Sequence, residues 1–271
     1  MQVSNSISDT ASLRGPLEAI LREAGEIAIA TSRREFKRWT KGHDNSPVSE
    51  ADLAVNDFLK NRLPVLAPQA GWLSEETEDD PAARATDTVW IVDPIDGTRA
   101  FITKRPDWTI CVALVDRGRP QLAGVYAPVT NEMFLAAAGL GATRNGTPIG
   151  VSSGGDLSGA RTAGPRRYLD HLATLSPGTQ QQPKVYSLAL RLTRVAEGAF
   201  DVALSSPGSH DWDLAAADLL IHEAGGILTD IAGHGLRYNR PETTHGTLIA
   251  TSTARHGPLI GLMRDRLPEF V

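Results

Sequence analysis

The sequence predicts a layered protein of helices and strands, with an α+β region over residues 1–150 and an α/β region over residues 151–271. Three observations in the 271-residue chain predict this class. Two apolar stripes at helical spacing come first, short β-rich segments follow, and helices then alternate with strands. The glycine- and serine-rich stretch 152–159 separates the two patterns and is the best linker candidate.

The first region opens with two amphipathic helices, which the spacing of apolar residues predicts over 13–38 and 51–63. Ser49, with Asp52 three residues later, resembles a pair that caps the start of the second helix. Basic residues near the end of the first helix are interpreted as a solvated helix end, where the helix dipole favours positive charge. These residues are Arg33, Arg34, Lys37, Arg38 and Lys41.

Strand-forming residues dominate the rest of the first region, and the short loops between the segments predict antiparallel neighbours. The predicted strands cover residues 88–92, 109–115, 121–126 and 132–137. Beyond the linker, the pattern predicts helices over 168–175, 187–197, 214–224 and from about 258, and strands over 200–204, 227–229 and 247–250. Gly225 and Gly226 stop the third of these helices, and we expect them to adopt the left-handed conformation.

Composition excludes several classes of protein. The formal net charge is −5 and no basic stripe is present, so a nucleic-acid polymer is not an expected partner. No apolar run approaches the roughly 18 residues of a membrane span, and Met1–Ser6 lack the basic start of a signal peptide. We therefore expect a soluble, cytoplasmic protein without a membrane partner. The single cysteine, Cys111, excludes an intramolecular disulfide and is expected to be a buried small apolar residue.

Two aspartates, Asp93 and Asp96, end an apolar strand in the segment Trp90-Ile91-Val92-Asp93-Pro94-Ile95-Asp96-Gly97-Thr98. Taken alone, Asp-Pro-x-Asp-Gly predicts a tight turn. However, two crowded carboxylates repel each other unless a cation lies between them. The following residues predict a short helix over 98–103, whose first N–H groups would suit an anion such as phosphate. The segment therefore admits both readings, a turn and a metal site.

Other acidic residues occur in similar contexts, in Ser74-Glu75-Glu76 and in His210-Asp211-Trp212-Asp213. Each alone is more typical of a surface loop or of a favourable charge at a helix start. Together these segments resemble the inositol monophosphatase family of Mg²⁺-dependent, lithium-sensitive phosphatases. The resemblance rests on the segment 90–98, on Trp212-Asp213-Leu214-Ala215-Ala216 with Glu223-Ala224-Gly225-Gly226, on Glu75-Glu76, and on Pro47-Val48-Ser49-Glu50-Ala51-Asp52. It implies a five-layered αβαβα sandwich.

The resemblance also implies roles for individual residues and two or three Mg²⁺ ions. The implied metal ligands are Glu75, Asp93, the carbonyl of Ile95, Asp96 and Asp213. Asp52 and Thr98 would orient a metal-activated water, and Glu75 would be a third catalytic group. For Asp52, the role of helix cap stays open beside this catalytic role. The phosphate would contact Glu75, Ile95, Asp96, Gly97, Thr98 and Asp213. Because the implied ligands come from both regions, we expect the active site to lie between them.

The substrate is the least determined part of the prediction. Inositol monophosphatases often carry a glutamate shortly before the Trp-Asp motif, but residues 203–210 contain no acid, and Asp211 replaces the usual cysteine. The segments 44–48 and Tyr186-Ser187-Leu188 look more like the 3′(2′),5′-bisphosphate nucleotidase branch, which converts adenosine 3′,5′-bisphosphate to AMP. Basic residues available for a second phosphate are Arg99, Lys104, Arg105, Arg166, Arg167 and Arg191.

Three alternatives stay open. The first two are an inositol-1-monophosphatase and a histidinol-phosphate phosphatase, which the segment 96–101 resembles. The third, from another class, is a metal-bound regulatory protein without catalysis. The expected partner is a small phosphorylated substrate, and a homodimer is one state that the resemblance allows.

Overall fold

The computed structural model of the chain describes residues 10–41, 46–264 and 270. Within these residues the helices are α1 (Thr10–Ser32), α2 (Glu50–Arg62), the 3₁₀-helix η1 (Leu63–Val65), α3 (Thr98–Ile102), α4 (Arg166–Leu175), α5 (Leu188–Ala196), α6 (Asp211–Glu223) and α7 (Thr253–Arg264). The prediction about Met1–Ser6 and the part of the 44–48 comparison that falls on residues 44 and 45 lie outside the described residues.

The strands form two large sheets and two short two-stranded sheets. The seven-stranded sheet has the order β3-β4-β5-β6-β7-β8-β9, and the five-stranded sheet has the order β11-β10-β12-β16-β14. The strands of the larger sheet are β3 (Gly71–Ser74), β4 (Thr88–Asp96), β5 (Thr109–Asp116), β6 (Arg119–Ala127), β7 (Glu132–Ala137), β8 (Ala142–Arg144) and β9 (Thr147–Pro148). Those of the smaller sheet are β10 (Arg161–Ala163), β11 (Gln180–Gln181), β12 (Val202–Ser205), β14 (Gly226–Asp230) and β16 (Leu248–Ser252). The two-stranded sheets pair β1 (Arg38–Lys41) with β2 (Ser46–Ser49), and β13 (Ser209–His210) with β15 (Thr244–His245).

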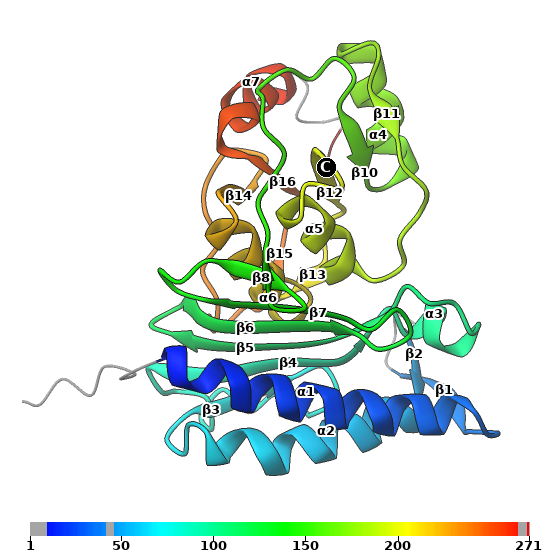
Figure 1. The fold of residues 1–271 in the computed structure, drawn as a ribbon, viewed down its shortest axis with the longest axis vertical. Coiled ribbons are helices and arrows are strands. Elements are labelled where there is room, and N and C mark those ends of the chain that lie inside the picture. The colour runs from blue at the N-terminus through cyan, green and yellow to red at the C-terminus, as the bar shows by residue number, and fades with distance from the viewer. Residues whose placement is uncertain (1–9, 42–45, 265–269, 271) are drawn as a thin grey trace, which may run out of the picture.

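Helices and sheets alternate in five layers, which confirms the predicted αβαβα sandwich (Figure 1). α1 and α2 cover one face of the seven-stranded sheet, and α5 and α6 lie between the two sheets. α4 and α7 cover the outer face of the five-stranded sheet. None of the helices in the described ranges combines the length and apolar character that crossing a membrane requires.

The alternation of side chains along the central strands produces these layers. In β4, Trp90 and Val92 pack with the cluster of α1 and α2, whereas Val89 and Ile91 pack with the cluster of α5 and α6. Successive strand residues point to opposite faces of a sheet, so a strand covered by helices on both faces is apolar throughout. Because α5 and α6 pack against both sheets in a single cluster, the division at residue 150 stays a prediction.

The predicted antiparallel order of β4, β5, β6 and β7 is confirmed. An additional strand, β3, runs parallel to β4 and pairs Leu73 with Ile91. It was too short to predict from a pattern of alternation. The pairing continues at Glu75, whose backbone N–H donates to the carbonyl of Val92 at 3.2 Å. β3 therefore carries Glu75 to the end of β4 where the two aspartates lie.

The prediction of a tight turn at Asp93-Pro94-Ile95-Asp96 is wrong. β4 continues through this segment to Asp96, and its register with β5 shifts between Asp93 and Asp96. The shift is a bulge, a position where a strand tolerates a proline that cannot donate to the ladder. The bulge lets both aspartates leave the same strand end close together.

The first helix is shorter than predicted, because α1 ends at Ser32 and not at residue 38. The side chains of Thr31 and Ser32 donate back to the carbonyls of Ile27 and Ile29, which competes with continuation of the helix. The basic residues that follow are therefore not a solvated helix end. Lys41 lies in β1, whose partner β2 leads into α2.

In the second region, α6 begins at Asp211 and α7 at Thr253, both earlier than predicted, with Pro258 inside α7. Gly225 adopts the expected left-handed conformation with φ of 86°, but Gly226 does not and instead begins β14. A Cβ atom on Gly226 would lie 2.8 Å from Cγ2 of Ile221 and 2.9 Å from the carbonyl oxygen of Thr251. Close packing, and not a positive φ, therefore excludes a side chain there.

Candidate functional site

Three aspartates from two separate elements converge at one point. Asp93 and Asp96 leave the bulge of β4, and Asp213 lies in the first turn of α6. Each offers a carboxylate oxygen, and these oxygens all lie within 4.8 Å of one another. Such a spacing allows several oxygens to bind the same cation.

Electrostatics also indicate a cation at this point. Burial raises the pKa of Asp93 and of Asp213 well above the usual value, and the neighbouring carboxylates raise both further. Burial raises the pKa of Asp96 as well, against the opposing effect of hydrogen bonds from the start of α5. A divalent cation would remove the repulsion, and a donor set made only of oxygens suits Mg²⁺. The residues present therefore fit the metal that the sequence predicts.

Glu75 joins this cluster from the end of β3 and lines the same cavity. Burial raises its pKa, and Lys41 opposes that rise. The Nζ atom of Lys41 lies 3.1 Å from Oε1 of Glu75 and 2.6 Å from Oε1 of Glu76. Sequence reasoning missed this role of Lys41, because no local pattern links it to two glutamates more than 30 positions away.

Asp52 contacts both Ser49 and Thr98, so its position is compatible with both roles that the sequence left open, the helix cap and the partner of Thr98. Its Oδ2 accepts from the backbone N–H of Ser49 at 2.9 Å, which completes a capping box at the start of α2. Its Oδ1 lies 3.1 Å from Oγ1 of Thr98, which also lies 3.1 Å from the carbonyl oxygen of Ile95. Burial raises the pKa of Asp52 to about 6. The hydroxyl of Thr98 is thus held between two acceptors at the edge of the acidic cluster.

Asp96 also holds the start of α5. Its Oδ2 accepts from Oγ of Ser187 at 2.5 Å and from the backbone N–H of Ala189 at 2.7 Å. Gly97, the next residue, has a φ of 90°, and a Cβ atom there would lie 3.0 Å from the backbone N of Ser187. Glycine is therefore required where β4, α3 and α5 meet. This contact ties the position of α5 to the acidic cluster.

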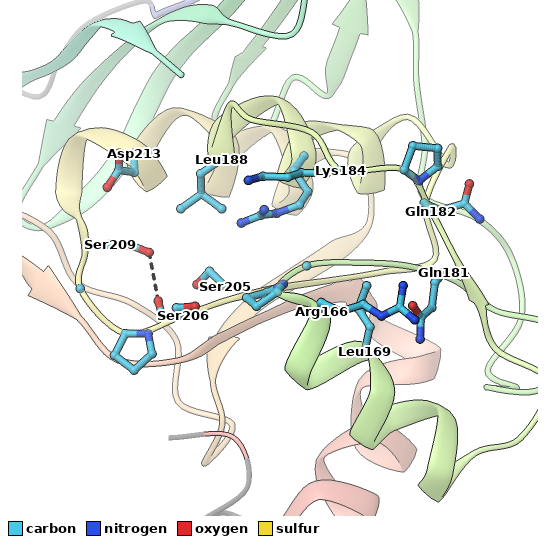
Figure 2. Close-up of a pocket in the computed structure, with 16 residues that line it drawn as sticks. Arg166, Leu169, Gln181, Gln182, Lys184, Leu188, Ser205, Ser206, Ser209 and Asp213 are labelled. Carbon is cyan, nitrogen blue, oxygen red and sulfur yellow. Dashed lines mark hydrogen bonds between the residues drawn. The ribbon is translucent and has the colours of Figure 1, made fainter. Parts of the chain in front are cut away.

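Two adjoining cavities open around the cluster. The smaller, of about 240 Å³, brings together Glu75, Asp93, Asp96, Gly97, Thr98 and Asp213 from the predicted set, with Lys184 and Tyr186 in addition. Asp52 and Ile95 are buried and do not line it. The larger, of about 890 Å³, shares Asp213 and Lys184 with the smaller one. Figure 2 shows Asp213, Leu188 and Lys184 on one side of the larger cavity and Ser205, Ser206 and Arg166 on the other.

The basic residues predicted for a second phosphate separate into groups. Arg191 and Arg166 line the larger cavity, and Arg99 lines the smaller one. Arg166 is 81% exposed and pairs with Asp170, so it lies at the rim. The remaining three, Lys104, Arg105 and Arg167, line neither cavity. Lys184 was missed by sequence reasoning, and its Nζ lies 4.3 Å from the ring centroid of Tyr186.

The raised carboxylate pKa values predict an unusual pH dependence of stability for the metal-free protein. An unfolded aspartate loses its proton near pH 4, whereas folded Asp52 keeps its proton up to about pH 6. The folded state therefore binds more protons in this window, and stability falls as pH rises through it. Asp52 alone would contribute on the order of 2–3 kcal/mol. In EDTA we expect Tm to fall from pH 5 to pH 8, with a smaller fall in Asp52→Asn. A Tm that stays level or rises over this range would contradict the assignment.

Comparisons with known proteins cover nearly the whole chain. A family model described as the inositol monophosphatase family matches residues 9–265. Nus factor SuhB of Escherichia coli strain K12 is 31% identical over 264 residues, which cover 90% of this chain and 96% of SuhB. The 3′(2′),5′-bisphosphate nucleotidase CysQ of Aggregatibacter actinomycetemcomitans is 30% identical, covering 83% of this chain and 86% of CysQ. The solved structure of inositol monophosphatase from Anabaena (Nostoc) sp. PCC 7120 superposes with a TM-score of 0.77 at 26% identity, covering 95% of this chain and 97% of that one.

Proposed function

The chain belongs to the inositol monophosphatase family of metal-dependent phosphatases, and we propose that it is a Mg²⁺-dependent phosphomonoesterase whose substrate is adenosine 3′,5′-bisphosphate. One observation supports the reaction most strongly. The acidic cluster of Asp93, Asp96 and Asp213 shares a cavity of about 240 Å³ with the hydroxyl of Thr98. A cation site and a group that can orient water thus lie within the space of one phosphate ester.

Asp93, Asp96, Asp213 and Glu75 would hold the metal, with the carbonyl of Ile95 next to them as the remaining predicted ligand. When bound, Mg²⁺ lowers the pKa of water and offsets the negative charge of the phosphoryl oxygens. The number of ions, two or three, is part of the proposal.

The protein's own groups position and deprotonate the attacking water. The hydroxyl of Thr98 donates to Oδ1 of Asp52 or to the carbonyl of Ile95, so its lone pairs are free to accept a proton from water in the cavity. Thr98 can then pass its own proton to Asp52. The pKa of Asp52, raised to about 6, suits a group that receives a proton near neutral pH. Gly97 lines the same cavity, where the absence of a side chain would let the backbone approach the phosphate.

Three observations support a bisphosphorylated nucleotide over a cyclitol or amino-alcohol phosphate. The relative CysQ is named for this activity. The wall formed by residues 205–209 presents serines, a proline and a glycine where an acid would be needed to meet sugar hydroxyls. The adjoining cavity of about 890 Å³ is within the range of sites that enclose larger ligands. Inositol 1-phosphate, the substrate suggested by the name of the Anabaena relative, is the second candidate.

Phosphate release from a substrate panel tests the proposal. The panel contains adenosine 3′,5′-bisphosphate, inositol 1-phosphate and histidinol phosphate, each with Mg²⁺ and with EDTA. We expect the nucleotide to have a kcat/KM at least tenfold above the other two, and all release to stop in EDTA. If inositol 1-phosphate or histidinol phosphate has the higher kcat/KM, that compound and not the nucleotide is the substrate. The phosphatase assignment would still hold.

The alternative from another class is a regulatory protein that binds the metal without catalysing a reaction. The name of the Escherichia coli relative, Nus factor SuhB, suggests this alternative. Four of the five predicted ligands, Glu75, Asp93, Asp96 and Asp213, line one cavity with Thr98, whose hydroxyl lies 3.1 Å from Oδ1 of Asp52. A purely structural metal site does not need the Thr98 and Asp52 pair. If no member of the panel releases phosphate in Mg²⁺ while the protein still binds the ion, the regulatory alternative is favoured.

A further inference from the structure

Asp211 carries a buried carboxylate that the acidic cluster does not include. It opens α6, two residues before Asp213, and is 1% exposed. It lines neither cavity of the candidate site. A buried carboxylate is costly unless donors satisfy its oxygens. A role other than contact with the substrate must therefore account for this side chain.

The loop from Asn239 to His245 closes around this carboxylate. Oδ2 of Asp211 accepts from the backbone N–H of Asn239 at 2.7 Å, and Oδ1 lies 2.7 Å from Nε2 of His245. The backbone N–H of Asp211 donates to the carbonyl of Thr243 at 2.9 Å. Because an ionised carboxylate only accepts, Nε2 of His245 carries the proton in this bond. One loop thus holds both oxygens and the N–H of Asp211.

Arg84 ties the loop 239–245 to the seven-stranded sheet. Its side chain is buried, and its Nη1 donates to Oδ1 of Asn239 and to the carbonyl of Arg240, each at 3.0 Å. Nδ2 of Asn239 donates back to the carbonyl of Arg84 at 3.1 Å. A Cβ atom on Gly71, the first residue of β3, would lie 2.9 Å from Cα of Arg84, so Arg84 packs directly against that sheet. The contacts therefore run from the sheet through Asn239 to Asp211.

The position of Asp213 depends on the same turn of α6. Its Oδ2 accepts from the backbone N–H of His210 at 2.6 Å, which fixes the carboxylate relative to the helix start. Its partners in the acidic cluster, Asp93 and Asp96, come from β4 of the seven-stranded sheet. Crowded carboxylates repel one another until a cation binds, so the helix start must be held against that repulsion. The loop 239–245 supplies such a restraint between helix and sheet.

The pair of Asp211 and His245 also explains the residue type at position 211. The resemblance to the family makes a cysteine the usual residue there, whereas this chain has an aspartate. A thiol is a weak acceptor with a single sulfur atom, whereas a carboxylate accepts strongly at two oxygens. Only the aspartate can therefore bind the N–H of Asn239 and Nε2 of His245 together.

We propose that Asp211 and His245 are positioning residues of the metal site, which hold the first turn of α6 so that Asp213 keeps its place beside Asp93 and Asp96. This inference rests on the metal site of the proposed function and deepens it, since neither residue of the pair lines the cavity of the acidic cluster. The affinity for Mg²⁺ then depends on two side chains outside that cluster.

The test measures Mg²⁺ affinity separately from stability. The full chain is compared by isothermal titration with Mg²⁺, by thermal unfolding in EDTA, and by turnover of adenosine 3′,5′-bisphosphate over a range of Mg²⁺ concentrations. The variants are His245→Leu, which removes the donor, His245→Gln, which keeps an N–H donor, and Asp211→Ala, alone and combined with His245→Leu. The matched control is Tyr238→Phe, which removes a hydrogen bond of 2.9 Å to Asp218 on the same helix.

We expect His245→Leu to raise Kd for Mg²⁺ about tenfold, as the loss of one charge-assisted hydrogen bond allows. Excess Mg²⁺ should restore kcat to within threefold of the wild type, because His245 touches no reacting group. His245→Gln should recover part of the affinity. The double variant should bind Mg²⁺ no more weakly than the weaker-binding single variant, since members of one pair are not additive. Tyr238→Phe should lower Tm in EDTA, as His245→Leu does, but should keep Kd within twofold of the wild type.

Three results would overturn the positioning role. They are a wild-type Mg²⁺ affinity in both His245→Leu and Asp211→Ala, losses that add in the double variant, and an equal loss in Tyr238→Phe, which would make general packing of α6 the cause. A wild type that binds no Mg²⁺ refutes the metal site, and the positioning role falls with it. The expected losses of affinity without any phosphate release would keep the positioning role and refute only the catalytic function. If His245→Leu or Asp211→Ala does not fold, the affinity of His245→Gln against that of Tyr238→Phe decides.

Discussion

Asp93→Asn is expected to lower kcat more than 1000-fold and to abolish Mg²⁺ binding. Asp93 is buried at the centre of the acidic cluster, where Glu75, Asp96 and Asp213 all raise its pKa. An amide keeps the shape of the side chain but supplies neither the charge nor the second anionic oxygen that a hard cation prefers. Because the metal offsets the charge of the phosphoryl group, its loss removes the largest contribution to catalysis.

Stability separates this effect from unfolding. Removing one of several repelling carboxylates should raise Tm of the metal-free protein at pH 8, while Mg²⁺ should no longer raise Tm. Kinetics, isothermal titration with Mg²⁺ and thermal unfolding in EDTA check the three parts. Asp57→Asn, on the solvent side of α2, is the control and should match the wild type in each. An Asp93→Asn protein that binds Mg²⁺ normally and keeps its activity would refute the metal site.

Thr98→Ala should lower kcat by about 100- to 1000-fold, the range in which proton transfer and water positioning contribute. Its Oγ1 lies 3.1 Å from Oδ1 of Asp52, and Thr98 lines the cavity, so removing the hydroxyl interrupts the proposed path of the proton. KM and the affinity for Mg²⁺ should change less than threefold, because Thr98 contributes no carboxylate to the acidic cluster.

Thr98→Ser is the matched variant, since it keeps the hydroxyl and removes only the methyl group. It should retain activity within about tenfold of the wild type. Steady-state kinetics and titration with Mg²⁺ on both variants distinguish the roles. Equal losses in the alanine and serine variants would mean that the methyl group, and not the hydroxyl, is what matters. A loss of Mg²⁺ affinity would mean that Thr98 supports the metal site itself.

Much of the fold and of the site could be predicted because its signals are local. The strand-forming residues of 88–92 and 109–115 predict the two central strands β4 and β5, and Ser49 with Asp52 predicts the start of α2 correctly. The predicted acids Glu75, Asp93, Asp96 and Asp213 do line one cavity. This prediction rested on the residue types and their order in the chain, which resemble those of a known family. The turn predicted for Asp93 to Asp96 is instead a bulge.

By itself, the sequence determined the layered αβαβα class, the helix and strand types of the longer elements, and the acidic residues of the centre. Only the tertiary structure decided that Asp96 holds the start of α5, that Lys41 pairs with Glu75 and Glu76, and that Arg191 and Ser205 face one cavity. The physical reason is the range of the interactions. Helix caps and strand alternation depend on residues a few positions apart, whereas these contacts join side chains from separate elements that only the packing of two sheets around α5 and α6 brings together.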